Sequence, residues 1–453
     1  MNRVAEAATN TSTQAVLQRA LPAALEAHGR GELDAAWTWL DEASRVAPNH
    51  PDVLHLRGLV ALGRGQPSAA VAWIERAAGA SPRTALYWNN LGVAWRAAGD
   101  LTRAAAAHRQ AIALKPGYAS AHNNLGAVLA AGGDYRVAAK AFAKAISLGA
   151  RSSDIWENHA KALLCLGRFS EAWSSYRHRE GRRLAPPERP WPRDMSGLRI
   201  ALRREQGIGD QLFFLRFADV AVAYGAQVGI DVDPRLNGML ARSGLAGVGD
   251  AIDDEAEIGD LPWLLGLGDE DSIVPPLRLS VLSDRAARVA ATLSRLPRPW
   301  IGVTWHAGGA RGQHRTFKTV PIDRLGASLR DRPGTIVSVQ RHPDAADHAA
   351  LASALGRPLL DLSGWNEDLE LMLALMAALD GYVGVSNANV HLRCGAGLGS
   401  DVLVPFPMDW RWRSVEDGTV PWYPGSRAYH QQVDGDWDAA FAALTDSLRS
   451  RWP

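Results

Sequence analysis

The sequence predicts a multidomain protein of the α + α/β class, in which a solenoid of paired helices precedes two doubly wound lobes. Residues recur with a fixed 34-residue period in the first part of the chain. Apolar runs of strand length alternate with helical patterns in the second part, and a segment rich in charge and proline lies between the two. We therefore expect a repeat array over 1–180, a linker over 181–197, and lobes over 198–297 and 298–453.

Four series of residues share the 34-residue period. They are Gly31, Gly65, Gly99, Gly133 and Gly167; Ala36, Ala70, Ala104, Ala138 and Ala172; Ala43, Ala77, Ala111 and Ala145; and Pro48, Pro82 and Pro116. Glycine permits the positive φ at which the chain turns out of the first helix of each pair. Alanine leaves room where two helices cross, and proline closes the second helix because it cannot continue it. The period therefore predicts about five helix–turn–helix units.

These units resemble the tetratricopeptide repeat (TPR), most closely in NNLGVAWRAAGDLTRAAAAHRQAIALKP and NNLGAVLAAGGDYRVAAKAFAKAISLG. Asn90, Asn124 and Asn158 share one position on the first helix of successive units, which lines the concave face of such arrays. A row of amides can hydrogen-bond the backbone of an extended peptide. The array of nucleocytoplasmic O-GlcNAc transferases carries a similar asparagine ladder, so the resemblance implies acceptor-peptide binding. The alternative is that the three asparagines are solvent-facing polar residues of a solenoid.

The second half of the chain favours parallel sheets built from βαβ units. The expected strands are 198–202, 227–232, 300–305, 335–339, 381–385 and 402–405, and the expected helices are 211–224, 367–379 and 437–449. The last helix is expected to pack back across the lobes. Two such lobes that face a cleft predict the GT-B arrangement of twin Rossmann-like lobes.

Four motifs resemble, in order, those of bacterial TPR-containing glycosyltransferases related to the ADP-heptose:LPS heptosyltransferases. They are GIGD at 207–210, GVTWHAG at 302–308, GVSNANVHLRCGAGLG at 384–399, and DWRW at 409–412 with PWYP at 421–424. The resemblance runs from about Leu198 to the C-terminus and implies a nucleotide-sugar as substrate, with no separate cofactor. Asn387 and Ala388 stand where that family has Asp-Thr, and His306 replaces a small residue. These departures leave the donor sugar and its nucleotide open.

The loop after the strand at 300–305 is the first candidate for the donor site, because ligands of open parallel sheets bind beyond the carboxyl ends of the strands. Gly308 and Gly309 let the backbone approach a bound group closely. Arg315 and Lys318 suit the neutralisation of a diphosphate leaving group and replace a metal ion, so no metal is expected. The alternative is that both are ordinary surface charges.

The turn from Ser386 into the next helix is the second candidate, because free backbone N–H groups and the helix dipole favour a pyrophosphate there. Ser386, Asn387 and Asn389 can add donors, although Ser386 or Asn387 can instead simply cap the helix. His391 matches the histidine of the resembling family, and its alternative is a core histidine with satisfied hydrogen bonds. Gln340, at a strand end, is expected to reach the nucleotide.

Sugar transfer with inversion requires a base that deprotonates the acceptor hydroxyl. Asp210 matches a proposed base of the heptosyltransferases, and its alternative role is that of a helix N-cap. His306 faces the same cleft and is the second candidate for the base. Trp410, Trp412 and Trp422 could stack on a base or sugar ring, although such aromatics are more often core.

Composition narrows the class of protein further. The formal net charge of +1 argues against a nucleic-acid partner. No stretch has the pattern of a secretory signal or the length of an apolar membrane span, and Cys165 and Cys394 match no metal-ligand spacing. A cytoplasmic protein with reduced thiols is therefore expected.

Together these features predict a bacterial glycosyltransferase that moves a sugar from a nucleotide-sugar donor to a protein acceptor recruited by the TPR groove, for example flagellin or another surface protein. Two alternatives stay open. The acceptor could be a glycan or a lipid-linked sugar, with the repeats serving assembly. The chain could also be a non-catalytic scaffold with degenerate lobes, which the Asn387 replacement would fit.

Overall fold

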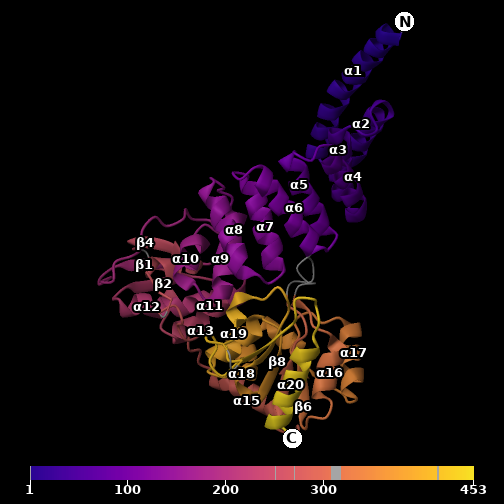
Figure 1. Cartoon of the computed structure of the whole chain (residues 1–453). Helices are drawn as coiled ribbons and strands as arrows, with labels where there is room; N and C mark the ends of the chain where they lie inside the picture. The colour runs from indigo at the N-terminus through magenta and orange to yellow at the C-terminus, as the bar shows by residue number, and fades with distance from the viewer. Residues whose placement is uncertain (1, 250, 270, 308–317, 416–417) are drawn as a thin grey trace. The chain divides into compact units, whose positions relative to one another are not determined.

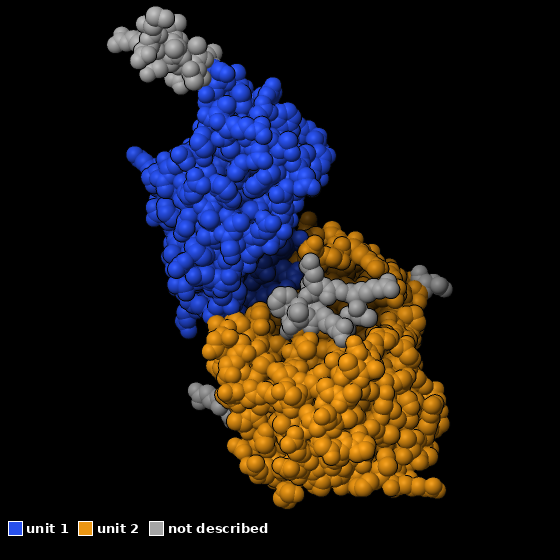
Figure 2. All heavy atoms as spheres, turned by 90° about the vertical axis from the view of Figure 1, so that its right-hand side faces the viewer, with its two compact units in different colours: residues 1–162 blue, residues 163–453 orange. Residues whose placement is uncertain are grey.

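The computed structural model describes residues 2–249, 251–269, 271–307, 318–415 and 418–453, with side chains from residue 12 onward. The chain divides into two compact units, Met1–Ala162 and Leu163–Pro453, which Figure 2 shows in blue and orange. The division falls inside a helix, upstream of the boundary at residue 180 that the repeats predict. The domain boundaries drawn from the sequence stay predictions.

The first unit is a succession of helices that pack as hairpins (Figure 1). Its helices are α1 (Asn2–Gly29), α2 (Leu33–Val46), α3 (Pro51–Gly63), α4 (Pro67–Ala80), α5 (Ala85–Ala97), α6 (Leu101–Leu114), α7 (Ala119–Ala131), α8 (Tyr135–Ser147) and the larger part of α9 (Ser153–Leu166). Neighbouring pairs such as α3 and α4, or α5 and α6, make the densest contacts. The predicted helical solenoid is confirmed in this unit.

The residues of the 34-residue period play the predicted roles. All five periodic glycines have positive φ, between 69° and 87°, at the turn between the helices of a pair. Every alanine of the two periodic series is 0% exposed. A further series was not recognised in the sequence: Gly58, Gly92 and Gly126 lie where the two helices of a pair touch, against Ile74, His108 and Phe142 respectively. A β-carbon at any of these glycines would overlap the facing side chain.

The second unit contains two parallel sheets, which confirms its predicted α/β character. The four-stranded sheet has the order β3-β2-β1-β4 and the six-stranded sheet the order β10-β9-β8-β5-β6-β7. The strands are β1 (Arg199–Arg203), β2 (Gln227–Asp231), β3 (Ala246–Gly247), β4 (Asp254–Glu257), β5 (Trp300–Val303), β6 (Thr335–Ser338), β7 (Leu360–Asp361), β8 (Gly381–Gly384), β9 (Asp401–Val404) and β10 (Arg427–His430). The direction of strand addition reverses beside β1 in the first sheet and beside β5 in the second.

Helices connect these strands and cover the sheets. They are α10 (Phe169–Tyr176), α11 (Ile208–Phe214), α12 (Ala218–Ala223), α13 (Asn237–Arg242), α14 (Leu261–Leu264), α15 (Ser283–Leu293), α16 (Ile322–Leu329), α17 (Ala345–Leu355), α18 (Leu369–Ala378), α19 (Ala388–Gly395) and α20 (Asp438–Arg451), with short 3₁₀ turns between some of them.

Two helices differ from their predicted form. The single helix expected over 211–224 is two helices, α11 and α12, joined by a 3₁₀ turn at Leu215–Phe217. The final helix α20 packs on the six-stranded sheet, where Phe441, Leu444 and Leu448 join the apolar core. It therefore covers its own sheet. The apolar face of α20 is satisfied locally, so a crossing between lobes is not needed to bury it.

Candidate functional site

A cavity of about 930 Å³ in the second unit lies beyond the carboxyl ends of β1, β5, β6 and β8. This is where open parallel sheets place their ligands. The cavity collects eight of the predicted site residues: Asp210, His306, Lys318, Gln340, Ser386, Asn387, Asn389 and His391. Gly308, Gly309 and Arg315 fall outside the described residues. Their predicted roles are therefore not addressed by the structure.

Asp210 lies in the first turn of α11, directly after β1. Gly207 is the N-cap of this helix, so the alternative role of Asp210 as the capping residue does not apply. The Asp210 carboxylate instead accepts a hydrogen bond of 2.6 Å from Nη2 of Arg411. Its side chain is 33% exposed, toward the cavity that it lines. The carboxylate is thus both accessible and oriented by a buried cation.

Arg411 lines the cavity and was not predicted as a site residue from the sequence. Its guanidinium bridges Asp210 and Asp409, with 3.3 Å between Nη1 of Arg411 and the Asp409 carboxylate. It also lies over the rings of Phe213 and Trp410, at 4.9 Å and 4.5 Å. Burial alone would raise the pKa of Asp409, but Arg411 and Lys318 outweigh burial and hold that pKa far below its usual value. The DWRW motif was predicted to contribute its tryptophans, but it contributes the charged residues Asp409 and Arg411 to the site.

Lys318 and Ser386 approach the same carboxylate. Each has a polar atom 3.5 Å from Oδ2 of Asp409. The Lys318 side chain is 45% exposed, so its ammonium group is available to the cavity as well as to Asp409. The loop after β5 was predicted to bind the diphosphate, and its described residue Lys318 lines the cavity as a cation.

His306 is held in place by Gln340. The Gln340 carboxamide accepts from the backbone N–H groups of Trp305 and His306, and it lies 3.2 Å from Nδ1 of the His306 ring. Its amide group also donates to the carbonyl of His306. Gln340 lines the cavity as predicted, but its amide is engaged within the protein. Its observed role is to orient the His306 backbone and imidazole.

The turn before α19 is organised by Asn387. Its side-chain oxygen accepts from the backbone N–H groups of Asn389 and Val390, which caps the helix, while its amide donates to the Thr304 hydroxyl at 2.9 Å. The Asn389 amide donates to the backbone carbonyl of Val339 and is buried. Asn387 therefore caps α19, which was the alternative role considered for it. The same contacts fix the N-terminus of α19 at the edge of the cavity.

His391 follows in α19 and is buried. Burial lowers the pKa of its imidazole well below the usual value, and the nearby cations of Arg411 and Arg216 lower it further. The Tyr423 hydroxyl lies 2.7 Å from Nδ1 of His391, and the Arg216 guanidinium lies over the Tyr423 ring, 4.8 Å from its centroid. A β-carbon at position 209 would lie 3.0 Å from Cδ2 and 3.2 Å from Nε2 of the His391 ring, so Gly209 permits a close approach of α11 to this ring.

The tryptophans near the C-terminus are core residues and do not line the cavity. Trp410, Trp412 and Trp422 are almost fully buried, and Phe213 of α11 packs edge-on against Trp410 and Trp422, with ring centroids 5.1 Å and 5.3 Å apart. This aromatic cluster fixes α11 and hence the position of Asp210.

Asp233 also lines the cavity and was overlooked in the sequence. It belongs to an Asp-x-Asp sequence, Asp231-Val232-Asp233, at the end of β2. Its carboxylate forms an ion pair of 2.9 Å with Arg235. The described residues hold no group of three or more His, Cys, Asp or Glu side chains that is arranged for a metal ion.

The asparagine ladder of the first unit is partly engaged with itself. Nδ2 of Asn90 lies 2.8 Å from Nε2 of His55, and Nδ2 of Asn124 donates to Oδ1 of Asn89 at 3.1 Å. His55 and Asn89 occupy the same position of consecutive repeats, so both of these ladder residues are braced by the repeat before them. Asn90, Asn124 and Asn158 are all half-buried. The repeats thus organise the predicted peptide-binding residues into a row.

The helical hairpins and their 34-residue period define the class of the first unit. The Tetratricopeptide repeat family model matches residues 55–119 and 123–177. The chain therefore carries tetratricopeptide repeats, followed by an α/β region. No described helix has the length and apolar character needed to cross a membrane.

Among characterised proteins the chain is similar to Protein FlbA of Caulobacter vibrioides. The two are 27% identical over 330 residues, which is 64% of this chain and 54% of FlbA. The chain thus matches about half the length of this relative.

Several solved structures are similar to part of the chain. TTC0263, a TPR protein of Thermus thermophilus, is 25% identical, with 35% of this chain and 87% of that chain covered and a TM-score of 0.31. PilF of Pseudomonas aeruginosa is 16% identical, with 47% and 90% covered and a TM-score of 0.36. MamA of Desulfovibrio magneticus is 26% identical, with 28% and 73% covered and a TM-score of 0.27. Scores of this size do not extend the assignment beyond the repeats.

Proposed function

We propose that this chain is a glycosyltransferase that transfers a sugar from a nucleotide-sugar donor to a protein. The observation that carries the proposal is the composition of the 930 Å³ cavity. A partly exposed carboxylate from the four-stranded sheet, Asp210, faces Lys318, His306 and the N-terminus of α19 from the six-stranded sheet. One side thus offers a proton acceptor and the other offers groups that suit a diphosphate.

The strand orders support the GT-B arrangement for the second unit. Each sheet is parallel, and in each the strand order reverses beside the strand whose carboxyl end carries a candidate site residue: Asp210 follows β1 and His306 follows β5. Ligands of doubly wound folds bind at such reversal points. Twin Rossmann-like lobes with a shared cleft are therefore part of the proposal.

The proposed reaction assigns a role to each group. The acceptor hydroxyl gives its proton to the Asp210 carboxylate, and its oxygen forms a bond to the anomeric carbon of the donor. The bond between that carbon and the diphosphate breaks, and the nucleoside diphosphate leaves with the electron pair. Lys318 and the positive dipole end of α19 stabilise the charge that develops on the leaving group. Arg411 keeps the base oriented, and no metal ion is required in this scheme.

The repeats of the first unit would supply the acceptor. Asn90, Asn124 and Asn158 form a row of amides suited to the backbone of an extended segment. Because the array and the cavity belong to one chain, a protein held by the array meets the cavity at a raised effective concentration. A bacterial surface protein such as flagellin is one acceptor that this arrangement would suit.

The test is a turnover assay on the full chain with a panel of UDP-, GDP- and ADP-linked sugars. Release of the nucleotide is expected to persist in excess EDTA and to fall about 10²–10⁴-fold in Asp210→Asn. The matched control is Asp284→Asn, which removes a carboxylate from the first turn of α15, outside the cavity. Alanine at all three ladder asparagines is expected to reduce transfer to protein without changing donor affinity.

Three results would count against this account. Dependence of turnover on added manganese would point to Asp233 and a metal-assisted reaction. A stable Asp210→Asn variant with normal turnover, beside an inactive His306→Ala, would move the base to His306. A wild-type chain that binds and cleaves none of the donors would favour the non-catalytic scaffold.

A further inference from the structure

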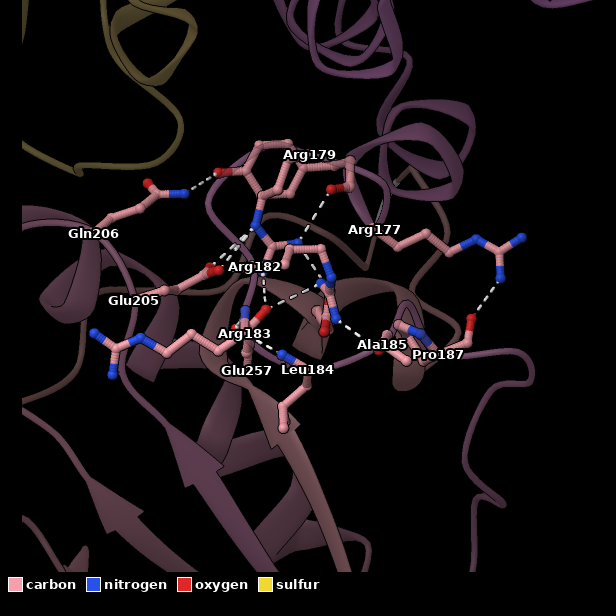
Figure 3. A network of polar contacts seen from close by, with 12 residues as sticks. Arg177, Arg179, Arg182, Arg183, Leu184, Ala185, Pro187, Glu205, Gln206 and Glu257 are labelled. Atoms are coloured by element: carbon pink, nitrogen blue, oxygen red, sulfur yellow. Dashed lines mark hydrogen bonds and ion pairs between the residues drawn. The ribbon is translucent and has the colours of Figure 1, made fainter. Parts of the chain in front are cut away.

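The turn that carries Asp210 is held from outside the cavity by the segment that follows the last helical repeat. Glu205 and Gln206 immediately precede Gly207, the first residue of that turn. The Glu205 side chain bonds Arg179, and the Gln206 side chain bonds Tyr176, the last residue of α10 (Figure 3). Neither Tyr176 nor Arg179 lines the cavity.

Arg179 makes the first of these connections. Its guanidinium donates to both carboxylate oxygens of Glu205, at 3.1 Å and 3.0 Å from Nε, and to Asp260 at 2.8 Å from Nη1. The side chains of Arg179 and Glu205 are 1% and 5% exposed. Arg182 and Glu257 complete this buried group, in which three carboxylates face two guanidinium groups. A buried pair of this kind fixes geometry, because its members have no alternative partner in solvent.

The space around this pair is filled. A β-carbon at Gly259 would overlap Oε1 of Glu205 and would lie 2.7 Å from Nη2 of Arg179. The chain therefore keeps a glycine where the ion pair touches the backbone that follows β4.

Tyr176 makes the second connection, at a strained residue. Gln206 has a φ of +57°, in the left-handed region that non-glycine residues seldom adopt. Its amide donates to the Tyr176 hydroxyl at 3.1 Å, and the Tyr176 ring stacks on Phe214 of α11 at 5.6 Å. Strained backbone persists only where surrounding contacts over-determine it, and such residues gather at functional sites. The hydroxyl of Tyr176 is one of the contacts that hold this strain.

We propose that Tyr176 and Arg179 are positioning residues for Asp210. They hold the two residues before the β1–α11 turn, and through it they place the carboxylate that faces the cavity. α10 and the residues after it therefore belong to the acceptor side of the site, although they touch no substrate. This inference rests on the proposed function for its catalytic meaning, while its structural part does not depend on it.

Removal of one hydroxyl tests the structural part. Tyr176→Phe and Gln206→Ala delete the same hydrogen bond from its two ends. In both variants of the full chain we expect amide hydrogen exchange of residues 204–211 to rise about three- to ten-fold, the factor that loss of one hydrogen bond supplies. The control is Tyr429→Phe, which deletes the bond from another buried tyrosine to Asp401, away from the cavity. It should leave exchange at 204–211 unchanged.

Nucleotide release by the same variants tests the catalytic part. In Tyr176→Phe the kcat for nucleotide release should fall while the KM for the donor stays near the wild-type value, because Asp210 acts on the acceptor. Unchanged exchange at 204–211 in both variants would overturn the inference, as would raised exchange with unchanged kcat. If the wild-type chain releases no nucleotide, the proposed function fails, and the exchange measurement still decides whether these residues position the turn.

Discussion

The two units of this chain are stabilised over very different sequence distances. In the repeats, Asn89 bonds His108, 19 residues away, and Asn124, 35 residues away. In the α/β unit, Asp210 bonds Arg411 across 201 residues, and Arg216 bonds the carbonyl of Trp422 across 206. Contacts in a solenoid run between neighbouring repeats. Periodic residues therefore specify the array, whereas the site depends on how the whole α/β unit folds.

The two units also differ in where they place charge. The array holds surface ion pairs such as Arg30 with Glu26, whose side chains are 57% and 70% exposed. The guanidinium groups of Arg411 and Arg179 are buried. Exposed pairs contribute little to stability, whereas removal of one partner from a buried pair leaves an uncompensated charge.

The largest expected effect is therefore at Arg411. Arg411→Met leaves Asp210 and Asp409 without their shared cation and should lower the free energy of unfolding of the α/β unit by about 3–5 kcal/mol. Arg30→Met is the matched change in the array and should cost less than about 1 kcal/mol. Urea unfolding, followed by hydrogen exchange in each unit separately, measures both. A loss below about 1 kcal/mol for Arg411→Met would show that the buried cation is not needed for stability.

A smaller effect is expected from a close helix contact in the array. A β-carbon at Gly92 would lie 2.6 Å from the His108 ring, so Gly92→Ala should overpack α5 against α6 and cost about 1–3 kcal/mol. Gly79→Ala is the control, because nothing lies within 4 Å of its added β-carbon and the change should gain about 0.5–1 kcal/mol. If both variants unfold at the same urea concentration, helix crossing at Gly92 is looser than the structure indicates.

The last prediction concerns the response of the array to acid. Burial lowers the pKa of His108 to about 4, with a further contribution from Arg96, and burial likewise lowers the pKa of His55 to about 4. Between pH 6.5 and pH 4 the unfolded chain binds protons at these rings that the folded chain does not. Stability should therefore fall with decreasing pH across this window, by about 1.4 kcal/mol per pH unit for each ring.

His108→Gln should remove one of these two protons and halve their joint contribution to the slope. The control is His122→Gln, since the His122 ring bonds the Pro116 carbonyl outside this network. Unfolding of α5 and α6 measured at closely spaced pH values gives the slope. An unchanged slope in His108→Gln would mean that the ring is already charged in the folded array.

The sequence predicts most of the strands and many of the cavity residues, but not the contacts that several of them make with other parts of the protein. Gln340 and Asn387 were expected to contact the donor, and both bind neighbouring protein groups. The chain also contained signals that were not used. Gly58, Gly92 and Gly126 share the 34-residue period, and Asp233 follows a predicted strand. Both signals are local, so they can be read from the sequence alone.

The amino-acid pattern alone was enough to specify the repeats, because turns at glycine and crossings at alanine depend on residues within one or two helices. It was also enough to predict that parallel strands would present polar turns at one edge. The folded α/β unit was needed to show that Arg411 pairs with Asp210, that Tyr423 orients His391, and that Tyr176 holds Gln206. These partners lie between 30 and 201 residues apart, and no periodicity relates them, so only folding of the whole unit brings them together.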